Sequence, residues 1–213
     1  AYEISACLVG SEMCIRDSYI LQEDEREIGI GSNNIKAVYV DEQKSLVYIG
    51  THAGGLTVLH RNSGQMESFN QLNSQLVNEN VYAILPDKEG SILLGTLSAL
   101  VSFNPEKRSF TTIDKEKDGT PFTSQRITIL FRDSRKRLWI GGEEGISVFQ
   151  QEGIEIEKAP ILPESSVTKM FTNCIYEAAN GIIWVGTREG FYCFNEKEKK
   201  IKRYTTAVSY THL

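Results

Sequence analysis

The sequence predicts an all-β fold built from a repeated unit, and three observations support this. Four glycines, Gly50, Gly95, Gly141 and Gly186, recur at intervals of 45, 46 and 45 residues. An apolar triplet precedes each glycine, and each copy contains four short β-rich segments without a helical period. Four antiparallel strands that recur about every 40 to 50 residues are typical of a β-propeller blade. The chain is therefore predicted to form about four propeller blades.

Each predicted blade begins with an apolar segment that forms its first strand. These segments are residues 37–40, 83–86, 129–132 and 174–177, and an aspartate follows the first three of them. A polar turn comes next, clearest at residues 87–90 and 179–181, where glycine or asparagine can adopt a positive φ. This turn is expected to join the first strand to the second.

The second strand carries the repeated glycine and is apolar at consecutive positions. It covers residues 47–51, 92–96, 138–142 and 183–187. A strand that is buried on both faces between neighbouring blades has this pattern, whereas a strand of an open antiparallel sheet alternates. One slot of this strand is therefore expected to pack between blades rather than to stack on a sugar, and it holds Tyr48, Leu93, Trp139 and Trp184.

Two further segments complete each blade. The third strands are predicted at residues 56–59, 100–103, 146–149 and 191–194, and the fourth at 66–69, 109–113, 154–156 and 201–204. Residues 19–206 comprise 188 residues, which at the observed period make about four blades. We expect an incomplete ring whose two open edges expose apolar blade faces and unpaired strands.

Composition and charge exclude several classes of protein. The 213 residues are 40% hydrophobic and carry a net charge of -5, which disfavours a nucleic-acid partner because phosphate binding needs a basic excess. No apolar run approaches the roughly 18 residues that cross a bilayer.

The four cysteines fit neither a zinc site nor a disulfide scaffold. Cys174 and Cys193 fall in apolar slots and are expected to be buried thiols, too far apart for a disulfide.

Several stretches closely resemble the two-component regulator propeller repeat. The resemblance is carried by residues 80–96 and 180–190 and by the polar spacer at residues 72–80, and it extends over residues 19–206. The second copy departs from the pattern, because Leu93 replaces the usual tryptophan and Ala99 the usual glycine. The third copy has Gly142 in place of threonine.

The resemblance implies the extracytoplasmic, periplasmic sensor of a membrane-anchored regulator, most often a hybrid histidine kinase. Such sensors are thought to respond to oligosaccharides. The implied partners are an oligosaccharide, the remaining blades and the membrane and kinase modules of a parent chain, and a second copy in a homodimer. Two alternatives stay open. The propeller can serve another output, such as a diguanylate cyclase or a DNA-binding regulator, or it can be an enzyme such as a lyase or glycosidase.

Candidate ligand residues are those that vary between blades on one face. The turn between the second and third strands opens on the same face as the start of the first strand, and propeller ligands usually bind there. The repeated threonines at 51, 96 and 187 are expected to be structural. No catalytic constellation, metal site or cofactor motif is evident, so this segment is expected to be no enzyme. The candidates are His52, Glu143, Glu144, Arg188 and Glu189 in the turns, with Asn34, Asn80, Arg126 and Asn173 at the first strands.

The two ends, residues 1–18 and 207–213, fit none of the repeats. Residues 13–17 can be encoded within AGATGTGTATAAGAGACAG, and the reverse complement of that string encodes residues 208–212. Opposite strands of one short DNA element should not encode two unrelated protein ends. The element resembles a transposon end used in sequencing adapters, so both segments are predicted to be artefacts that flank the partial propeller at 19–206.

Overall fold

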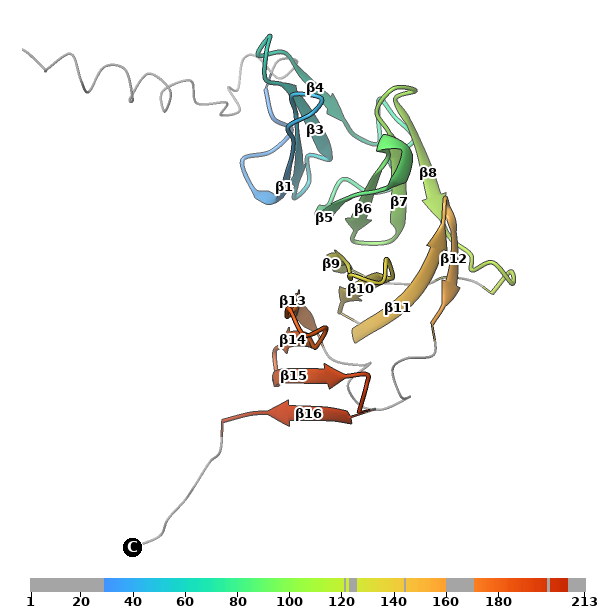
Figure 1. The fold of residues 1–213 in the computed structure, drawn as a ribbon. Helices are drawn as coiled ribbons and strands as arrows, with labels where there is room; N and C mark the ends of the chain where they lie inside the picture. The colour runs from blue at the N-terminus through green and yellow to red at the C-terminus, as the bar shows by residue number, and fades with distance from the viewer. Residues whose placement is uncertain are drawn as a thin grey trace, which may run out of the picture.

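The computed structural model describes residues 29–120, 122, 126–143, 145–159, 171–198 and 200–206, and it confirms the all-β prediction. Sixteen strands form four separate four-stranded antiparallel sheets, each made from consecutive strands of the chain (Figure 1). Each sheet is one propeller blade. The predicted artefact segments, 1–18 and 207–213, lie outside the described residues.

The strands follow the four repeats in order. Blade 1 contains β1 (Ile35–Asp41), β2 (Leu46–Thr51), β3 (Leu56–His60) and β4 (Met66–Phe69). Blade 2 contains β5 (Val81–Pro86), β6 (Ile92–Thr96), β7 (Leu100–Asn104) and β8 (Ser109–Ile113), with the short 3-10 helix η1 (Lys88–Gly90) between β5 and β6. Blade 3 contains β9 (Ile127–Arg132), β10 (Leu138–Gly142), β11 (Gly145–Glu152) and β12 (Glu155–Lys158). Blade 4 contains β13 (Thr172–Glu177), β14 (Ile183–Thr187), β15 (Gly190–Asn195) and β16 (Lys200–Tyr204).

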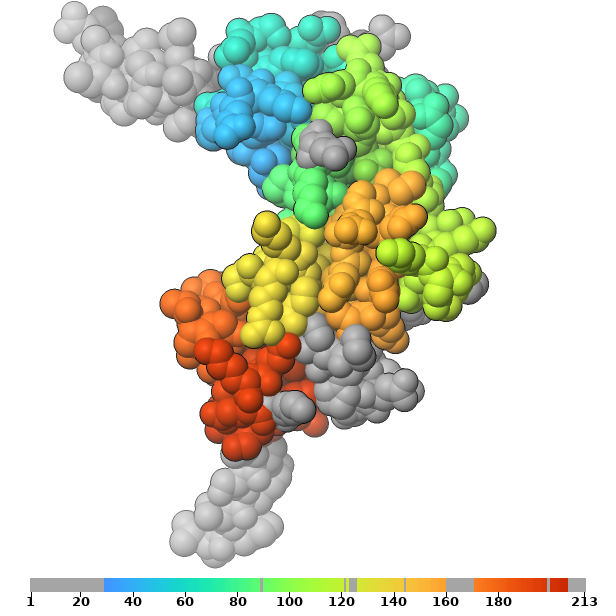
Figure 2. Space-filling model, turned by 45° about the vertical axis from the view of Figure 1, so that its right-hand side comes forward, coloured from blue at the N-terminus to red at the C-terminus, as the bar shows by residue number. Residues whose placement is uncertain are grey.

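The blades stand side by side in an open arc. The first strands, β1, β5, β9 and β13, contact one another in sequence and line the concave inner side (Figures 1 and 2). The fourth strands lie on the outer side. Among the described residues the four sheets do not close into a ring, so the arc leaves one face of blade 1 and one face of blade 4 without a neighbouring blade.

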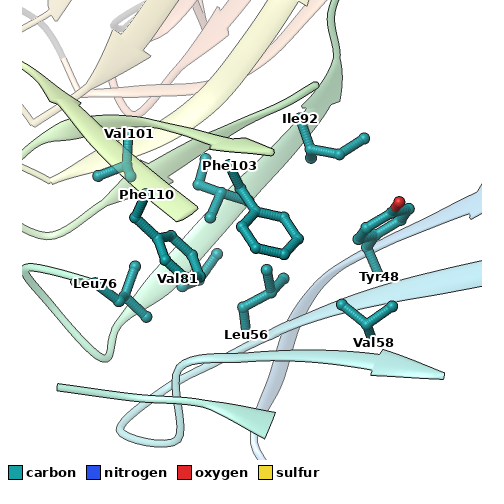
Figure 3. Close-up of a cluster of buried hydrophobic side chains, with 10 residues drawn as sticks. Tyr48, Leu56, Val58, Leu76, Val81, Ile92, Val101, Phe103 and Phe110 are labelled. Atoms are coloured by element: carbon teal, nitrogen blue, oxygen red, sulfur yellow. The ribbon is translucent and has the colours of Figure 1, made fainter. Parts of the chain in front are cut away.

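The apolar core lies between the blades, in three separate clusters. Blades 1 and 2 enclose the first cluster, where Tyr48 and Leu56 of blade 1 meet Phe103 and Phe110 of blade 2 (Figure 3). Blades 2 and 3 enclose a second cluster around Leu93 and Phe149, and blades 3 and 4 a third one around Trp139 and Phe194. Every residue of β6 and of β10 is buried, which accounts for the uninterrupted apolar pattern of the second strands.

The repeated slot of the second strand faces the next blade along the chain. Tyr48, Leu93 and Trp139 are at most 1% exposed in this slot. Trp184 is only half-buried because its face of blade 4 is open, and its ring packs within that blade on Phe191 and Tyr204. One slot thus supplies the main packing residue of each contact between blades.

The repeated glycines lie where two blades approach most closely. A Cβ atom on Gly50 would lie 2.8 Å from Val81 Cγ1, and one on Gly141 would lie 2.8 Å from Thr172 Cγ2. On Gly95 it would lie 2.6 Å from Ile127 Cγ2. In each case the contacted residue begins the first strand of the next blade, so the glycine provides the space in which that residue sits. No described blade follows Gly186, and of the described atoms a Cβ there would meet only those of Cys174 in its own blade.

The two open faces expose large apolar side chains, as expected for an incomplete ring. On blade 1 the exposed residues include Val38 and Val40 of β1. On blade 4 Phe191 and Tyr204 are 45% and 41% exposed, and their rings stack at a centroid distance of 4.7 Å. In the part of the chain that the structure describes, no helix is long and apolar enough to cross a membrane.

Replacing Gly95 with alanine should destabilise the protein by about 1 to 3 kcal/mol, because the new methyl group would push Ile127 and its backbone away from blade 2. Gly186→Ala is the matched control at the same position of the repeat. It should cost much less, since only the flexible side chain of Cys174 must move. Urea denaturation measures both. Equal losses would show that the glycine serves its own blade rather than the contact between blades.

Replacing Tyr48 with phenylalanine should leave stability unchanged or raise it by up to about 1 kcal/mol. The Tyr48 hydroxyl is buried without a hydrogen-bond partner among the described residues, so its removal relieves a desolvation cost. Burial, with smaller effects of Asp41 and Tyr39, also raises the pKa of Tyr48 to about 12.

The same variant should change the pH dependence of stability. Because the raised pKa favours the neutral phenol in the folded state, wild-type stability should fall as the pH rises above 10, where the unfolded side chain ionises. Denaturation between pH 9 and 11 should show a smaller fall in Tyr48→Phe. A fall of the same size in both proteins would contradict this assignment.

Candidate functional site

The residues predicted to bind a ligand lie on the face where the chain enters each first strand, which we call the entry face. One backbone hydrogen bond recurs there in all four blades. The residue after each second strand donates its N–H to the carbonyl of a residue just before the first strand. The four bonds are His52 to Asn34 (2.9 Å), Leu97 to Asn80 (3.2 Å), Glu143 to Arg126 (3.3 Å) and Arg188 to Phe171 (3.3 Å). The predicted turn residues and first-strand residues are therefore neighbours within each blade.

A row of side chains crosses the entry face over blades 1, 2 and 3. His52 Nδ1 lies 3.4 Å from the hydroxyl oxygen of Tyr82, and the two rings are 6.3 Å apart. The guanidinium carbon of Arg126 lies 5.6 Å from the centre of the Tyr82 ring. Arg126 Nη1 in turn lies 3.9 Å from Glu143 Oε2. Two predicted residues, His52 and Arg126, thus lie next to one aromatic ring that is partly exposed, and Glu143 joins the row through Arg126.

Tyr82 was not among the predicted residues. It occupies β5 between Val81 and Ala83, which are both buried, and reads in the sequence as one more member of an apolar strand. The available signal was its identity, since the equivalent positions in the other blades are Lys36, Thr128 and Asn173. A position that varies in this way between repeats is not fixed by the packing of the blade.

Asn80 is held in place by hydrogen bonds within the protein. Its side-chain oxygen accepts a hydrogen bond from the N–H of Ala53 in blade 1 at 3.1 Å, and its side-chain nitrogen donates to Asn78. Asn80 therefore ties the turn between β2 and β3 to the entrance of blade 2. This contact gives it a structural task in addition to any contact with a ligand.

Asn34 is exposed and is joined to the row through its carbonyl, which accepts the N–H of His52. The remaining predicted residues belong to blade 4 or are not described, and Asn173 is exposed. Arg188 stacks on Phe171 with its guanidinium carbon 3.9 Å from the ring centre, while Glu189 pairs with Arg203 at 3.6 Å. Glu144 lies outside the described residues.

The repeated threonines close the turns of the entry face. The hydroxyl of Thr51 donates to the carbonyl of Gly55 at 3.1 Å, and that of Thr187 donates to Gly190 at 2.8 Å. Thr96 makes the same contact with Ala99 at 2.8 Å. Blade 3 has Gly142 at this position, and the backbone ladder continues there from Gly142 to Gly145 without the hydroxyl.

The prediction for Cys174 was wrong. Cys193 is buried as expected, but Cys174 is exposed, although its slot corresponds to the buried Ala83. The first strand of blade 2 is covered by blade 3, whereas blade 4 has no next blade beside it. Exposure at this slot is therefore a consequence of the open edge.

The opposite face carries a cavity of about 710 Å³ that the sequence did not predict. It lies between the turns after β5 and β9 and the hairpin of β11 and β12, and its lining includes Lys88, Arg135 and Arg137. Arg135 and Arg137 are both paired with Glu196 of blade 4, at 2.6 and 3.0 Å. Two of the cavity's cations are thus already engaged in contacts that join two blades.

Buried aspartates organise this opposite face. Asp133 is fully buried and accepts hydrogen bonds from the Trp139 indole at 2.8 Å and from Arg137 Nε at 2.6 Å. Burial lowers the pKa of Arg137, but its hydrogen bonds to Asp133 and Glu196 outweigh that effect and the net shift is upward. The arrangement fixes the tryptophan slot of blade 3 from within the blade.

In blade 2 the equivalent aspartate, Asp87, accepts hydrogen bonds from different donors. Leu93 occupies the tryptophan slot and has no donor, and Asp87 instead accepts hydrogen bonds from two side chains of blade 3. Arg132 Nη2 donates to it at 2.8 Å and Gln151 Nε2 at 2.7 Å. Arg132 also donates to Gln151 at 2.7 Å, which closes a three-membered network. No group of three or more His, Cys, Asp or Glu side chains that could hold a metal ion occurs among the described residues.

Comparisons with known proteins found a matching repeat family, a curated relative and solved structures of the same fold. A family model described as two component regulator propeller matches residues 165–189, the start of the fourth repeat. A curated relative, histidine kinase P4 of Formosa agariphila, is 27% identical over 154 residues. The matched region is 67% of this chain and 11% of that relative, so this chain spans only a small part of its length.

Solved structures with the same fold include two from B. thetaiotaomicron. The extracellular domain assigned to the hybrid two component system BT3049 superimposes with a TM-score of 0.67 at 19% identity, over 85% of this chain and 25% of that one. The extracellular domain assigned to BT4673 gives 0.66 at 19% identity, over 81% and 22%. At this identity the likeness shows the propeller fold.

Removing the Asp87 carboxylate should destabilise the protein strongly, by about 3 kcal/mol, because Asp87→Ala leaves a largely buried Arg132 without its counter-ion. Asp41→Ala is the matched control at the same position of blade 1. Asp41 accepts the exposed N–H groups of Gln43 and Lys44 and has no ion pair among the described residues, so its loss should cost less than about 1 kcal/mol. Thermal or urea unfolding compares the two variants, and a similar cost for both would show that the contact with blade 3 contributes little.

Proposed function

Since the chain carries the two-component regulator propeller repeat, we propose that it is part of the ligand-sensing propeller of a bacterial histidine kinase regulator and that the ligand is an oligosaccharide. The open arc of four blades fits one part of a longer sensor. The similarity to a histidine kinase and to extracellular sensor domains supports an extracytoplasmic location, in the periplasm.

The observation that carries the proposal is the row of His52, Tyr82, Arg126 and Glu143. Oligosaccharide sites combine an exposed aromatic ring, which covers the apolar face of a sugar, with hydrogen-bonding side chains around it. Tyr82 offers the ring, and the side chains of His52 and Arg126 lie next to it. The three residues come from three blades, so a sugar bound there would contact several blades at once.

Ligand binding at this site would also affect the contact between two blades. Arg126 precedes β9 in blade 3 and donates its backbone N–H to the carbonyl of Leu97 in blade 2 at 2.8 Å. A ligand that orders Arg126 would therefore stabilise the contact between these two blades. We expect the signal to arise from this change in blade packing and to pass to the rest of the parent chain, which includes a membrane segment and the kinase.

Calorimetric titration of the 213-residue chain with a panel of neutral and acidic oligosaccharides tests the proposal. Binding to at least one member is expected, and Tyr82→Ala should weaken it by about tenfold or more through loss of stacking. Tyr176→Ala is the matched control, because Tyr176 is 66% exposed but lies near the other end of its innermost strand. Both variants should keep the wild-type melting temperature.

Two results would overturn the proposal. The first is the absence of binding to every member of the panel. The second is the release of new reducing ends during incubation, because turnover would make the propeller an enzyme. The coding sequence downstream tests the parent separately, and it should contain a membrane segment followed by a histidine kinase.

A further inference from the structure

A β-bulge recurs at one position of the first strand in all four blades. In blade 2, Val81 is paired with Thr96 and Ala83 with Gly95, which leaves Tyr82 between them without a partner. The same skip occurs in the pairing of the other three first strands with their second strands. The four unpaired residues, which we call the bulge residues, are Lys36, Tyr82, Thr128 and Asn173.

The bulge places a packing residue and an exposed residue next to each other in the first strand. The residue before it is the one that sits against the glycine of the preceding blade, and Val81, Ile127 and Thr172 are fully buried there. The bulge residue itself is exposed or partly exposed in every blade. An extra residue in one strand turns its side chain away from the regular pleat, and bulges are common beside binding sites for that reason.

The identities of the bulge residues also indicate a role other than packing between blades. The packing positions repeat glycine and threonine, but the bulge positions hold four different polar or aromatic residues. Thr128 is engaged within the protein, because its hydroxyl donates to the carbonyl of Thr172 in blade 4 at 2.9 Å. In the structure's described portion no ion pair is found for the ammonium group of Lys36, which lies exposed at the bulge beside blade 2.

The charge balance of the entry face indicates the kind of ligand. Among its described acids, Glu143 pairs with Arg126 and Glu189 with Arg203, while the Glu79 carboxylate accepts the backbone N–H of Gln71. The Lys36 ammonium is left uncompensated at the strand position equivalent to that of Tyr82 in the neighbouring blade. A sugar stacked on Tyr82 would therefore be bound best if it carried a negative group within reach of Lys36.

We propose that Lys36 and Tyr82 form a subsite for an acidic sugar, a uronic acid unit whose ring lies on Tyr82 and whose carboxylate pairs with Lys36. The inference rests on the proposed oligosaccharide function and adds the substrate class to it. Binding needs no covalent step, and the bulge residues set specificity because they can vary without disturbing the contacts that hold the blades together.

Tetrasaccharides of galacturonate, mannuronate and guluronate, each compared with its methyl ester, provide the test. Esterification removes the charge and leaves the sugar ring unchanged. Calorimetry on the 213-residue chain should show at least one acid bound about tenfold more tightly than its ester, with an affinity that falls as salt rises. Lys36→Met should abolish the preference for the acid and keep the weaker binding of the ester.

Lys107→Met is the matched control, because Lys107 is equally exposed but lies in the turn between β7 and β8. It should keep both the affinity and the preference of the wild type. Equal binding of acid and ester, or an unchanged preference in Lys36→Met, would overturn the subsite. Binding of neutral oligosaccharides alone would overturn the acidic class and leave the proposed function standing, whereas no binding of any sugar would remove both.

Discussion

The fold depends on one contact, the seating of a side chain from each first strand against the glycine of the preceding blade. Val81, Ile127 and Thr172 occupy the space where Gly50, Gly95 and Gly141 have no Cβ atom. This close approach brings the second-strand slot into contact with the next blade and buries the three clusters between blades. Since little of the core lies within a single blade, no blade can be stable without a neighbour.

The blades could be predicted from the sequence because this contact requires a glycine at the same position of every repeat. A glycine every 45 or 46 residues and an unbroken apolar strand before it leave few alternatives to sheets packed face to face. The error at Cys174 has the same origin. The repeat register assigned it to a buried slot, but burial there requires a blade on the far side, and the described arc ends at blade 4.

The candidate site was less accessible to prediction. His52 in a turn and Arg126 at the start of a first strand could be chosen because they vary between repeats in a region where propellers bind ligands. Tyr82 looks like one more residue of its apolar strand and differs from it only by varying between the repeats, because the bulge itself depends on hydrogen-bond pairing that has no signature in a single sequence. The opposite face was missed because the partners of Asp87 come from residues 45 and 64 positions further along the chain.

The network of Asp87, Arg132 and Gln151 limits how such a protein can evolve. The four blades share one fold, but their contacts with neighbouring blades differ. Blade 2 has leucine where blade 3 has a tryptophan that donates to its own aspartate, so blade 2 borrows its donors from blade 3. If blade 3 were exchanged for another blade, Asp87 would lose its hydrogen-bond donors. Blades 2 and 3 are therefore constrained to stay next to each other, in this order along the chain.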